Sequence, residues 1–236
     1  MHFLIIAIYA ILISIHRVAA SCTVASGLAY DQAVLQGDAT KAFAIIAQEI
    51  PMTQEERGHF KIIPGYSGSH DDRHGQADPD SLNINLDPDL FNEGESGACQ
   101  GIEHELTHLR QFRRDRSALY AHLRSATSEE DAYDSLEDND LTTHDASMEI
   151  EAVLSQIPFA PGGILRDDDF SYLMDQLKRW ADSQSMIIQH ANEAFYLPGI
   201  KKEDTRWFCA GVAFAQKKGA DTLFINGALS LCPLQN

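Results

Sequence analysis

The sequence predicts an α+β protein in which a small sheet is followed by a mainly helical C-terminal part. Two observations predict this class. Apolar residues recur at helical spacing over several long segments, whereas only short stretches alternate between apolar and polar residues as a half-buried strand does. Proline and glycine separate the segments, as at Pro51 and at Pro161-Gly162-Gly163. Strand signals and helix signals lie in separate runs of the chain, which is typical of α+β folds.

Strand signals are concentrated before residue 90. Leu82–Leu86 alternates between apolar and polar residues, and Phe60–Ile63 is a short, mainly apolar stretch that ends at a Pro-Gly pair. Between these two stretches, residues 65–80 are rich in Gly, Ser and Asp and predict a loop. One more strand is predicted near the C-terminus, over Thr222–Ile225.

Helix signals occupy most of the remaining chain. The predicted helices cover residues 38–50 with Asp38 as N-cap, 98–112, 147–157, 167–190 and 205–218. In the helix at 98–112 the apolar side chains recur at spacings of three and four: Ile102, Leu106, Leu109 and Phe112. We expect residues 21–236 to form a single domain, with an N-terminal lobe over about 21–115 and a helical lobe over about 116–236.

The first 20 residues have the pattern of an export signal. Phe3–Ile15 is apolar but shorter than the roughly 20 residues that a membrane span needs, and the small residues Val18-Ala19-Ala20 suit cleavage. We therefore expect residues 1–20 to be a signal peptide and the mature chain to be secreted or periplasmic. An uncleaved anchor and lipidation at Cys22 are the alternatives. The mature chain has no second long apolar run, so no transmembrane span is predicted in it.

All four cysteines follow the expected cleavage site. An even number of cysteines in an exported chain predicts two disulfides. Three pairings are possible, and we expect Cys22–Cys99 with Cys209–Cys232, because the second pair brackets the C-terminal segment.

The charge balance excludes one class of partner. The 236 residues include 18 Lys and Arg against 35 Asp and Glu, a formal net charge of -17. Such a surface repels phosphate backbones, so we expect no nucleic-acid partner.

Residues 104–108, His-Glu-Leu-Thr-His, have the H-E-x-x-H pattern. Residues four apart lie on one helical face, so His104 and His108 can reach one metal ion. Glu105 follows His104 directly and can act as a general base on a water molecule without being a ligand. The motif predicts one Zn²⁺ per chain, held by His104 and His108.

A catalytic zinc usually takes a third protein ligand. Candidates lie on the predicted helix at 147–157, where Glu149 and Glu151 point about 200° apart, so only one of them can face the metal. His144 is a further candidate, either as ligand or as a transition-state donor. The angle alone leaves this choice open.

The stretch HELTHLRQF at 104–112, followed by EIEA at 149–152, resembles the gluzincin branch of the zincin metallopeptidases. It is similar to families, including CAAX-protease-like ones, in which H-E-x-x-H precedes E-x-x-A-D. The resemblance implies that Glu149 is the third ligand and that Ala152 matches the alanine. Val153 replaces the acid that follows, so Asp145 or Glu151 would have to orient a histidine instead.

The resemblance also implies a zincin-like fold, in which an edge strand over the active-site helix binds an extended peptide. The strand that fits is formed by Leu82, Asn83, Ile84, Asn85 and Leu86. The function implied is zinc-dependent hydrolysis of peptide bonds, with a peptide or protein substrate and Glu105 as general base. The alternative is a non-catalytic secreted module that binds metal or a partner.

Overall fold

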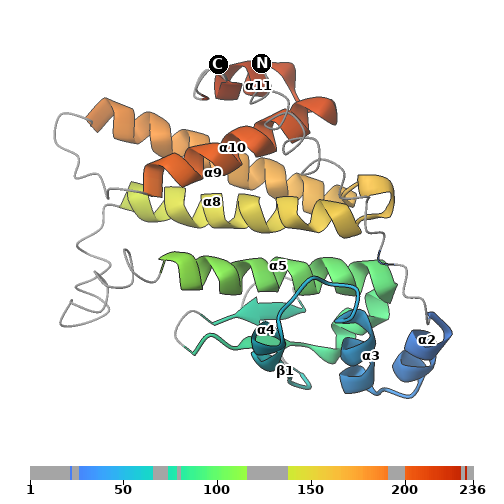
Figure 1. Cartoon of the computed structure of the whole chain (residues 1–236). Helices are drawn as coiled ribbons and strands as arrows, with labels where there is room; N and C mark the ends of the chain where they lie inside the picture. Colours follow the sequence, from blue (N-terminus) through green and yellow to red (C-terminus); the bar gives the residue numbers. More distant parts are fainter. Residues whose placement is uncertain are drawn as a thin grey trace, which may run out of the picture. The chain divides into compact units, whose positions relative to one another are not determined.

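The structure is a computed structural model that describes residues 22, 27–65, 74–78, 81–115, 138–190, 200–229 and 232, with only the backbone described at 115, 138–144, 183–190 and 200–205. It combines α-helices with one three-stranded sheet, which confirms the α+β class (Figure 1). The predicted signal peptide at 1–20 lies outside the described residues.

The chain packs into two compact units. The first comprises described residues up to 76 together with 85–103 and 156–165, and the second comprises 77–84, 104–155 and the residues from 166 onwards. The division falls inside helix α5 (Gly94–Asp115), between residues 103 and 104, whereas we expected it near 115. The C-terminal half of α5 therefore groups with the later helices.

Three helices begin the first unit. They are α2 (Gly27–Leu35), α3 (Ala39–Ile46) and α4 (Gln54–Gly58). Asp38 caps α3 as predicted, because its carboxylate accepts a hydrogen bond from the backbone N–H of Lys41 at 3.0 Å. Thr53 and Glu56 form a reciprocal capping box at the start of α4.

The sheet contains β1 (Phe60–Ile62), β2 (Gly75–Ala77) and β3 (Ile84–Leu86) in the order β1–β3–β2. Strand β3 is therefore central, and the prediction that Leu82, Asn83, Ile84, Asn85 and Leu86 form an edge strand is wrong. The central position leaves no free backbone edge on β3 for a peptide. The alternation of apolar and polar residues indicates only that one face of the strand is buried. Edge strands and central strands can both have one buried face, so the pattern does not distinguish them.

Two features explain why the observed strand is shorter than predicted and central in the sheet. Leu82 has a φ of 56° and its N–H donates to the carbonyl of Asp78 at 2.9 Å, so it closes a turn before the strand begins. Strand β2 lies in the segment where we predicted only loop. Its pairing with β3 is non-local, and its residues, Gly75, Gln76 and Ala77, have low strand propensity.

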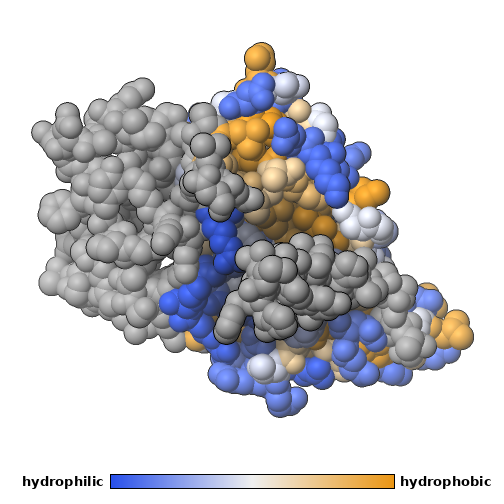
Figure 2. All heavy atoms as spheres, turned by 45° about the horizontal axis from the view of Figure 1, so that its top comes forward, coloured by the Kyte–Doolittle hydropathy of each residue, from blue (hydrophilic) through white to orange (hydrophobic). Residues whose placement is uncertain are grey.

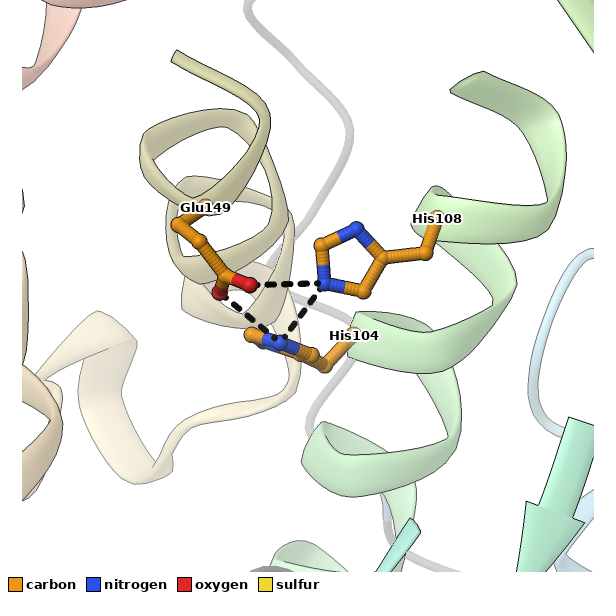
Figure 3. A group of neighbouring side chains, drawn as sticks. All are labelled: His104, His108 and Glu149. Atoms are coloured by element: carbon orange, nitrogen blue, oxygen red, sulfur yellow. Dashed lines mark hydrogen bonds and ion pairs between the residues drawn. The ribbon is translucent and has the colours of Figure 1, made fainter. Parts of the chain in front are cut away.

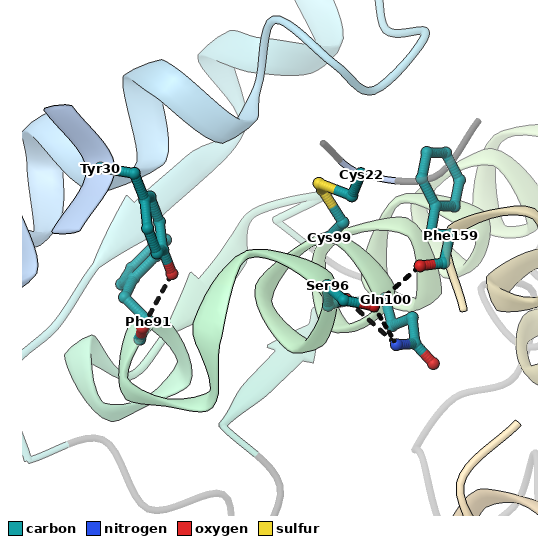
Figure 4. The surroundings of a disulfide bond; sticks show 7 residues. All are labelled: Cys22, Tyr30, Phe91, Ser96, Cys99, Gln100 and Phe159. Carbon is teal, nitrogen blue, oxygen red and sulfur yellow. Dashed lines mark hydrogen bonds between the residues drawn. A yellow bond between two sulfur atoms is a disulfide. The ribbon is translucent and has the colours of Figure 1, made fainter. Parts of the chain in front are cut away.

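The entry to α5 is fixed from three sides (Figure 4). After the short helix η1 (Pro88–Glu93), the phenol of Tyr30 donates to the carbonyl of Phe91 at 2.7 Å. The Cys22–Cys99 disulfide, which the sequence analysis expected, ties the N-terminal segment to α5. Ser96 donates to the carbonyl of Phe159, which belongs to η2 (Ile157–Phe159) and precedes η3 (Pro161–Gly163).

The second unit is built from helices α8 (Asp138–Gln156), α9 (Asp167–His190) and α10 (Ile200–Lys217), which run side by side in Figure 1. Gly211 on α10 permits this packing, because a Cβ there would lie 3.0 Å from Leu177 on α9 and 3.1 Å from Ile150 on α8. Helix α8 begins nine residues before the predicted 147, in an acidic stretch whose charges favour a helix N-terminus.

The last helix, α11 (Thr222–Leu229), replaces the strand predicted at Thr222–Ile225, and that prediction is wrong. The Asp221 carboxylate accepts from the N–H groups of Leu223 and Phe224 and so caps the helix. The disulfide Cys209–Cys232, the second of the expected pairing, joins α10 to the segment that follows α11.

A few large apolar side chains remain at the surface. Leu28 and Leu35 on α2 and Leu223 on α11 are each more than four-fifths exposed. On the face that Figure 2 shows, hydrophobic residues are visible beside hydrophilic ones. Among the described helices, none combines the length and the apolar character that a bilayer crossing requires.

Candidate metal centre

The two histidines of the H-E-x-x-H motif lie one turn apart on the buried face of α5. The apolar stripe of the helix, which includes Leu106 and Leu109, lies about 200° around it from the histidines and is also fully buried, so α5 is enclosed on both sides. His104 and His108 are therefore both buried, and their Nε2 atoms lie 3.1 Å apart. Their rings meet edge to face at a centroid distance of 4.7 Å.

Glu149 projects from α8 toward both histidines (Figure 3). Its Oε2 lies 3.4 Å from the Nε2 of His104, and its Oε1 lies 3.5 Å from the Nε2 of His108. The ligand atoms of these three residues all lie within 4.8 Å of one another, so the group can bind a metal ion. All three residues belong to the second unit.

The dimensions of this group fit zinc. Two ligand atoms about 2.0–2.1 Å from a tetrahedral zinc lie about 3.3–3.4 Å apart. The two histidine nitrogens lie 3.1 Å apart, and each lies 3.4 or 3.5 Å from a different oxygen of Glu149, so each of these pairs has a separation near that value. Two imidazole nitrogens and one carboxylate oxygen are also a ligand set that zinc accepts in catalytic sites.

Glu149 and the histidines are strongly coupled electrostatically. Burial by itself lowers the pKa of His108, but the charge and hydrogen bond of Glu149, together with the charge of Glu105 and the hydrogen bond of Gln111, outweigh it and raise that pKa to about 9. Burial by itself raises the pKa of Glu149, and the nearby histidines reverse the effect and hold it well below its usual range. A half-buried carboxylate that stays ionised is suited to bind a cation.

The other two candidate ligands behave differently. The Glu151 carboxylate turns away from the histidine pair and bonds to Arg114 in a bidentate arrangement, at 3.1 and 3.0 Å. It also accepts from the Nε2 of Gln111 at 3.0 Å. The side chain of His144 lies outside the described residues. Of the two acids, then, Glu149 joins the histidines, in agreement with the ligand that the resemblance implied.

Glu105 is buried beside the group but is not part of it. Its Oε2 accepts a hydrogen bond from the backbone N–H of Ala77 at 2.7 Å. Its charge contributes to the raised pKa of His108, so the carboxylate lies within electrostatic reach of that histidine. The strand residue that contacts the motif is therefore Ala77 in β2. We predicted that the strand over the active-site helix would instead be formed by residues 82–86.

Sequence reasoning missed Gln111, which lies next to His108. Its Oε1 is 2.8 Å from the Nδ1 of His108, and its side chain is 0% exposed. The available signal was its place three residues after His108 on the same buried face, where a polar side chain needs hydrogen-bond partners.

Searches with models of known protein families, among curated proteins and among solved structures found no match to this chain.

Proposed function

We propose that this protein is a zinc-dependent metallopeptidase, with His104, His108 and Glu149 as zinc ligands and Glu105 as general base. The observation that carries the proposal is a buried carboxylate outside a three-residue ligand group. A structural zinc site takes four protein ligands, whereas a catalytic site takes three and keeps one position open. Among the described residues the group offers three possible ligands, and a neighbouring carboxylate that is not one of them suits a catalytic site.

The chain's own residues supply the proton transfers. Bound zinc would supply Lewis acidity, which polarises a carbonyl group and lowers the pKa of a water molecule to about 7. Glu105 would accept a proton from the attacking water as its oxygen adds to the carbonyl carbon. The carbon–nitrogen bond would then break and Glu105 would give this proton to the leaving nitrogen, so that a carboxylic acid and an amine result. The remaining proton of the acid then passes to the amine, which leaves a carboxylate and an ammonium group.

The backbone of Ala77 has a part in this arrangement. Its N–H occupies Oε2 of Glu105 and leaves Oε1 to take the proton. A peptide bond is the substrate favoured by the gluzincin-like motif, and its sequence preference is outside this proposal.

The alternative function is a non-catalytic module that binds metal or a partner. The test is Glu105→Gln, with Glu95→Gln on the same helix as the matched control. We expect Glu105→Gln to keep zinc and to lose peptide hydrolysis by about 10²- to 10⁴-fold, the usual effect of removing a general base. A wild-type protein that binds zinc and cleaves no member of a mixed peptide library would favour the non-catalytic module.

The place of action is part of the proposal. Two disulfides are compatible with an oxidising compartment outside the cytosol, where secreted or periplasmic proteins function. Amino-terminal sequencing of the exported protein tests this, since cleavage near Ala20 leaves Ser21 as the first residue.

A further inference from the structure

The hydrogen bonds of Gln111 determine which way its amide points. At one end of the amide, two atoms that can only accept lie close by: the carbonyl oxygen of Met148 at 2.9 Å and an oxygen of Glu151 at 3.0 Å. Only an NH₂ group can satisfy both acceptors. The other end, 2.8 Å from the Nδ1 of His108, is therefore the carbonyl oxygen.

The amide in turn determines the tautomer of His108. Because Oε1 of Gln111 can only accept, the Nδ1 of His108 must carry a hydrogen and donate it. In the neutral ring the lone pair is then on Nε2, and Nε2 is the atom that lies 3.1 Å from His104 and 3.5 Å from Glu149. The lone pair thus points to the place where the three ligand atoms converge.

A salt bridge holds Glu151, the acceptor at the end of this series of hydrogen bonds, in place. Arg114 donates to both oxygens of Glu151, at 3.1 and 3.0 Å. One of these oxygens, Oε2, also accepts the hydrogen bond from Gln111. A planar guanidinium paired in this bidentate way fixes the plane of the carboxylate, whose oxygens accept from it. Glu151 therefore remains an acceptor, and the Gln111 amide cannot rotate without losing both of its N–H bonds.

We propose that Gln111 is a positioning residue that fixes His108 in the Nδ1–H tautomer and so presents its Nε2 to the metal, with Glu151 and Arg114 holding the amide in that orientation. This inference rests on the metal site of the proposed function. It assigns to an amide the role that a carboxylate has around many metal-bound histidines. Gln111 also joins α5 to α8, so its test must separate ligand orientation from helix packing.

The first experiment measures zinc affinity by competition with a chromophoric chelator, and the unfolding of the metal-free protein by chemical denaturation. We expect Gln111→Leu to weaken zinc binding by about 10- to 100-fold, the range for such outer contacts. Thr107→Val is the matched control, because it removes another hydrogen bond between the same helices, from Thr107 to Ser155 at 2.9 Å, without touching a histidine. It should lower stability and leave zinc affinity unchanged.

The second experiment exchanges the two side chains. In Gln111→Glu the new carboxylate faces Glu151 and cannot donate, so zinc binding should fall. In the double variant with Glu151→Gln, residue 111 can again accept from His108 while the amide at 151 donates to it, so affinity should return to within several-fold of wild type. The carbonyl of Met148 still lacks its donor, so the metal-free double variant should stay less stable than wild type.

The outcomes separate the two hypotheses. The positioning role is wrong if Gln111→Leu binds zinc as wild type does, or if zinc affinity follows stability through every variant, including Thr107→Val. Wild-type protein that binds zinc without cleaving peptides contradicts only the proposed function. Wild-type protein that binds no zinc contradicts both proposals.

Discussion

The backbone N–H of Ala77 donates a 2.7 Å hydrogen bond to the carboxylate of Glu105. Ala77 ends β2, an outer strand of the sheet, whereas Glu105 lies within the H-E-x-x-H motif of α5. The next residue, Asp78, directs its N–H to Asn83 on the opposite side, as alternation along a strand requires. The outward N–H of β2 is thus engaged by the candidate base and is not free for a peptide.

This contact yields a prediction for Ala77→Pro, which removes the N–H and nothing else that Glu105 uses. Proline is tolerated at an outer strand, so the fold should survive. Loss of a hydrogen bond to a charged group costs about 1.5–3 kcal/mol, and we expect peptide hydrolysis to fall by about 10- to 100-fold with zinc still bound. Ala77→Ser keeps the N–H and is the control. Equal activity in the proline and serine variants would refute the positioning of Glu105 by this amide.

A second prediction compares the two acids of α8. Glu149→Ala removes one of three proposed ligands and should weaken zinc binding by more than 100-fold, because direct ligands contribute more than outer contacts. Glu151→Ala should weaken it by about 10- to 100-fold, since it acts only through Gln111. Zinc affinities of the two variants, measured side by side, decide between them. Wild-type affinity in Glu149→Ala would exclude this residue as a ligand.

The sequence alone was sufficient for the part of the site that is local. His104, Glu105 and His108 lie within five residues, and helical periodicity places both histidines on one face. The third residue of the group lies 41 positions beyond His108, and only the resemblance to gluzincins distinguished Glu149 from Glu151. The contacts of Glu151 now give a physical reason for that choice, because Arg114 and Gln111 hold it away from the histidines.

The features that the sequence could not predict are tertiary. Strand β2 is three residues long and is held by its pairing with β3, so no local sequence pattern predicts it. The same pairing makes β3 central and moves the motif's strand contact to Ala77. The error at 222–225 has a different origin, because a segment with only three consecutive apolar residues is compatible with either a strand or a helix, and the cap from Asp221 favours the helix.

A third prediction concerns the two disulfides. The Cys22–Cys99 bond spans 77 residues and the Cys209–Cys232 bond spans 23. In the chain-entropy description, loops of these lengths correspond to about 4.5 and about 3.5 kcal/mol. Replacing Cys22 and Cys99 by alanine should therefore lower the free energy of unfolding more than replacing Cys209 and Cys232. Denaturant unfolding of the two double variants measures this, and the reverse order would contradict it.

The final prediction is that zinc binding releases a proton from His108. Burial lowers the pKa of His108, but the charge and hydrogen bond of Glu149, with contributions from Glu105 and Gln111, raise it to about 9, so at neutral pH the metal-free ring carries a proton on both nitrogens. Gln111 accepts the hydrogen on Nδ1, so the proton on Nε2 is the one that a metal must displace. Protons compete with zinc below pH about 9, and the competition weakens as the pH rises toward that value.

The apparent zinc affinity should therefore rise with pH, by about tenfold between about pH 7 and about pH 8 from this group. Titration calorimetry in buffers of different ionisation enthalpy counts the protons released per zinc. Glu149→Gln is the comparison, measured with enough zinc to saturate both proteins, because it removes the largest of the effects that raise the pKa of His108, so a smaller fraction of the ring should be protonated at neutral pH. Wild type should therefore release more protons per zinc than this variant, since the acidified water contributes to both. Equal proton release by the two proteins would show that Glu149 does not raise the pKa of His108 in the metal-free site.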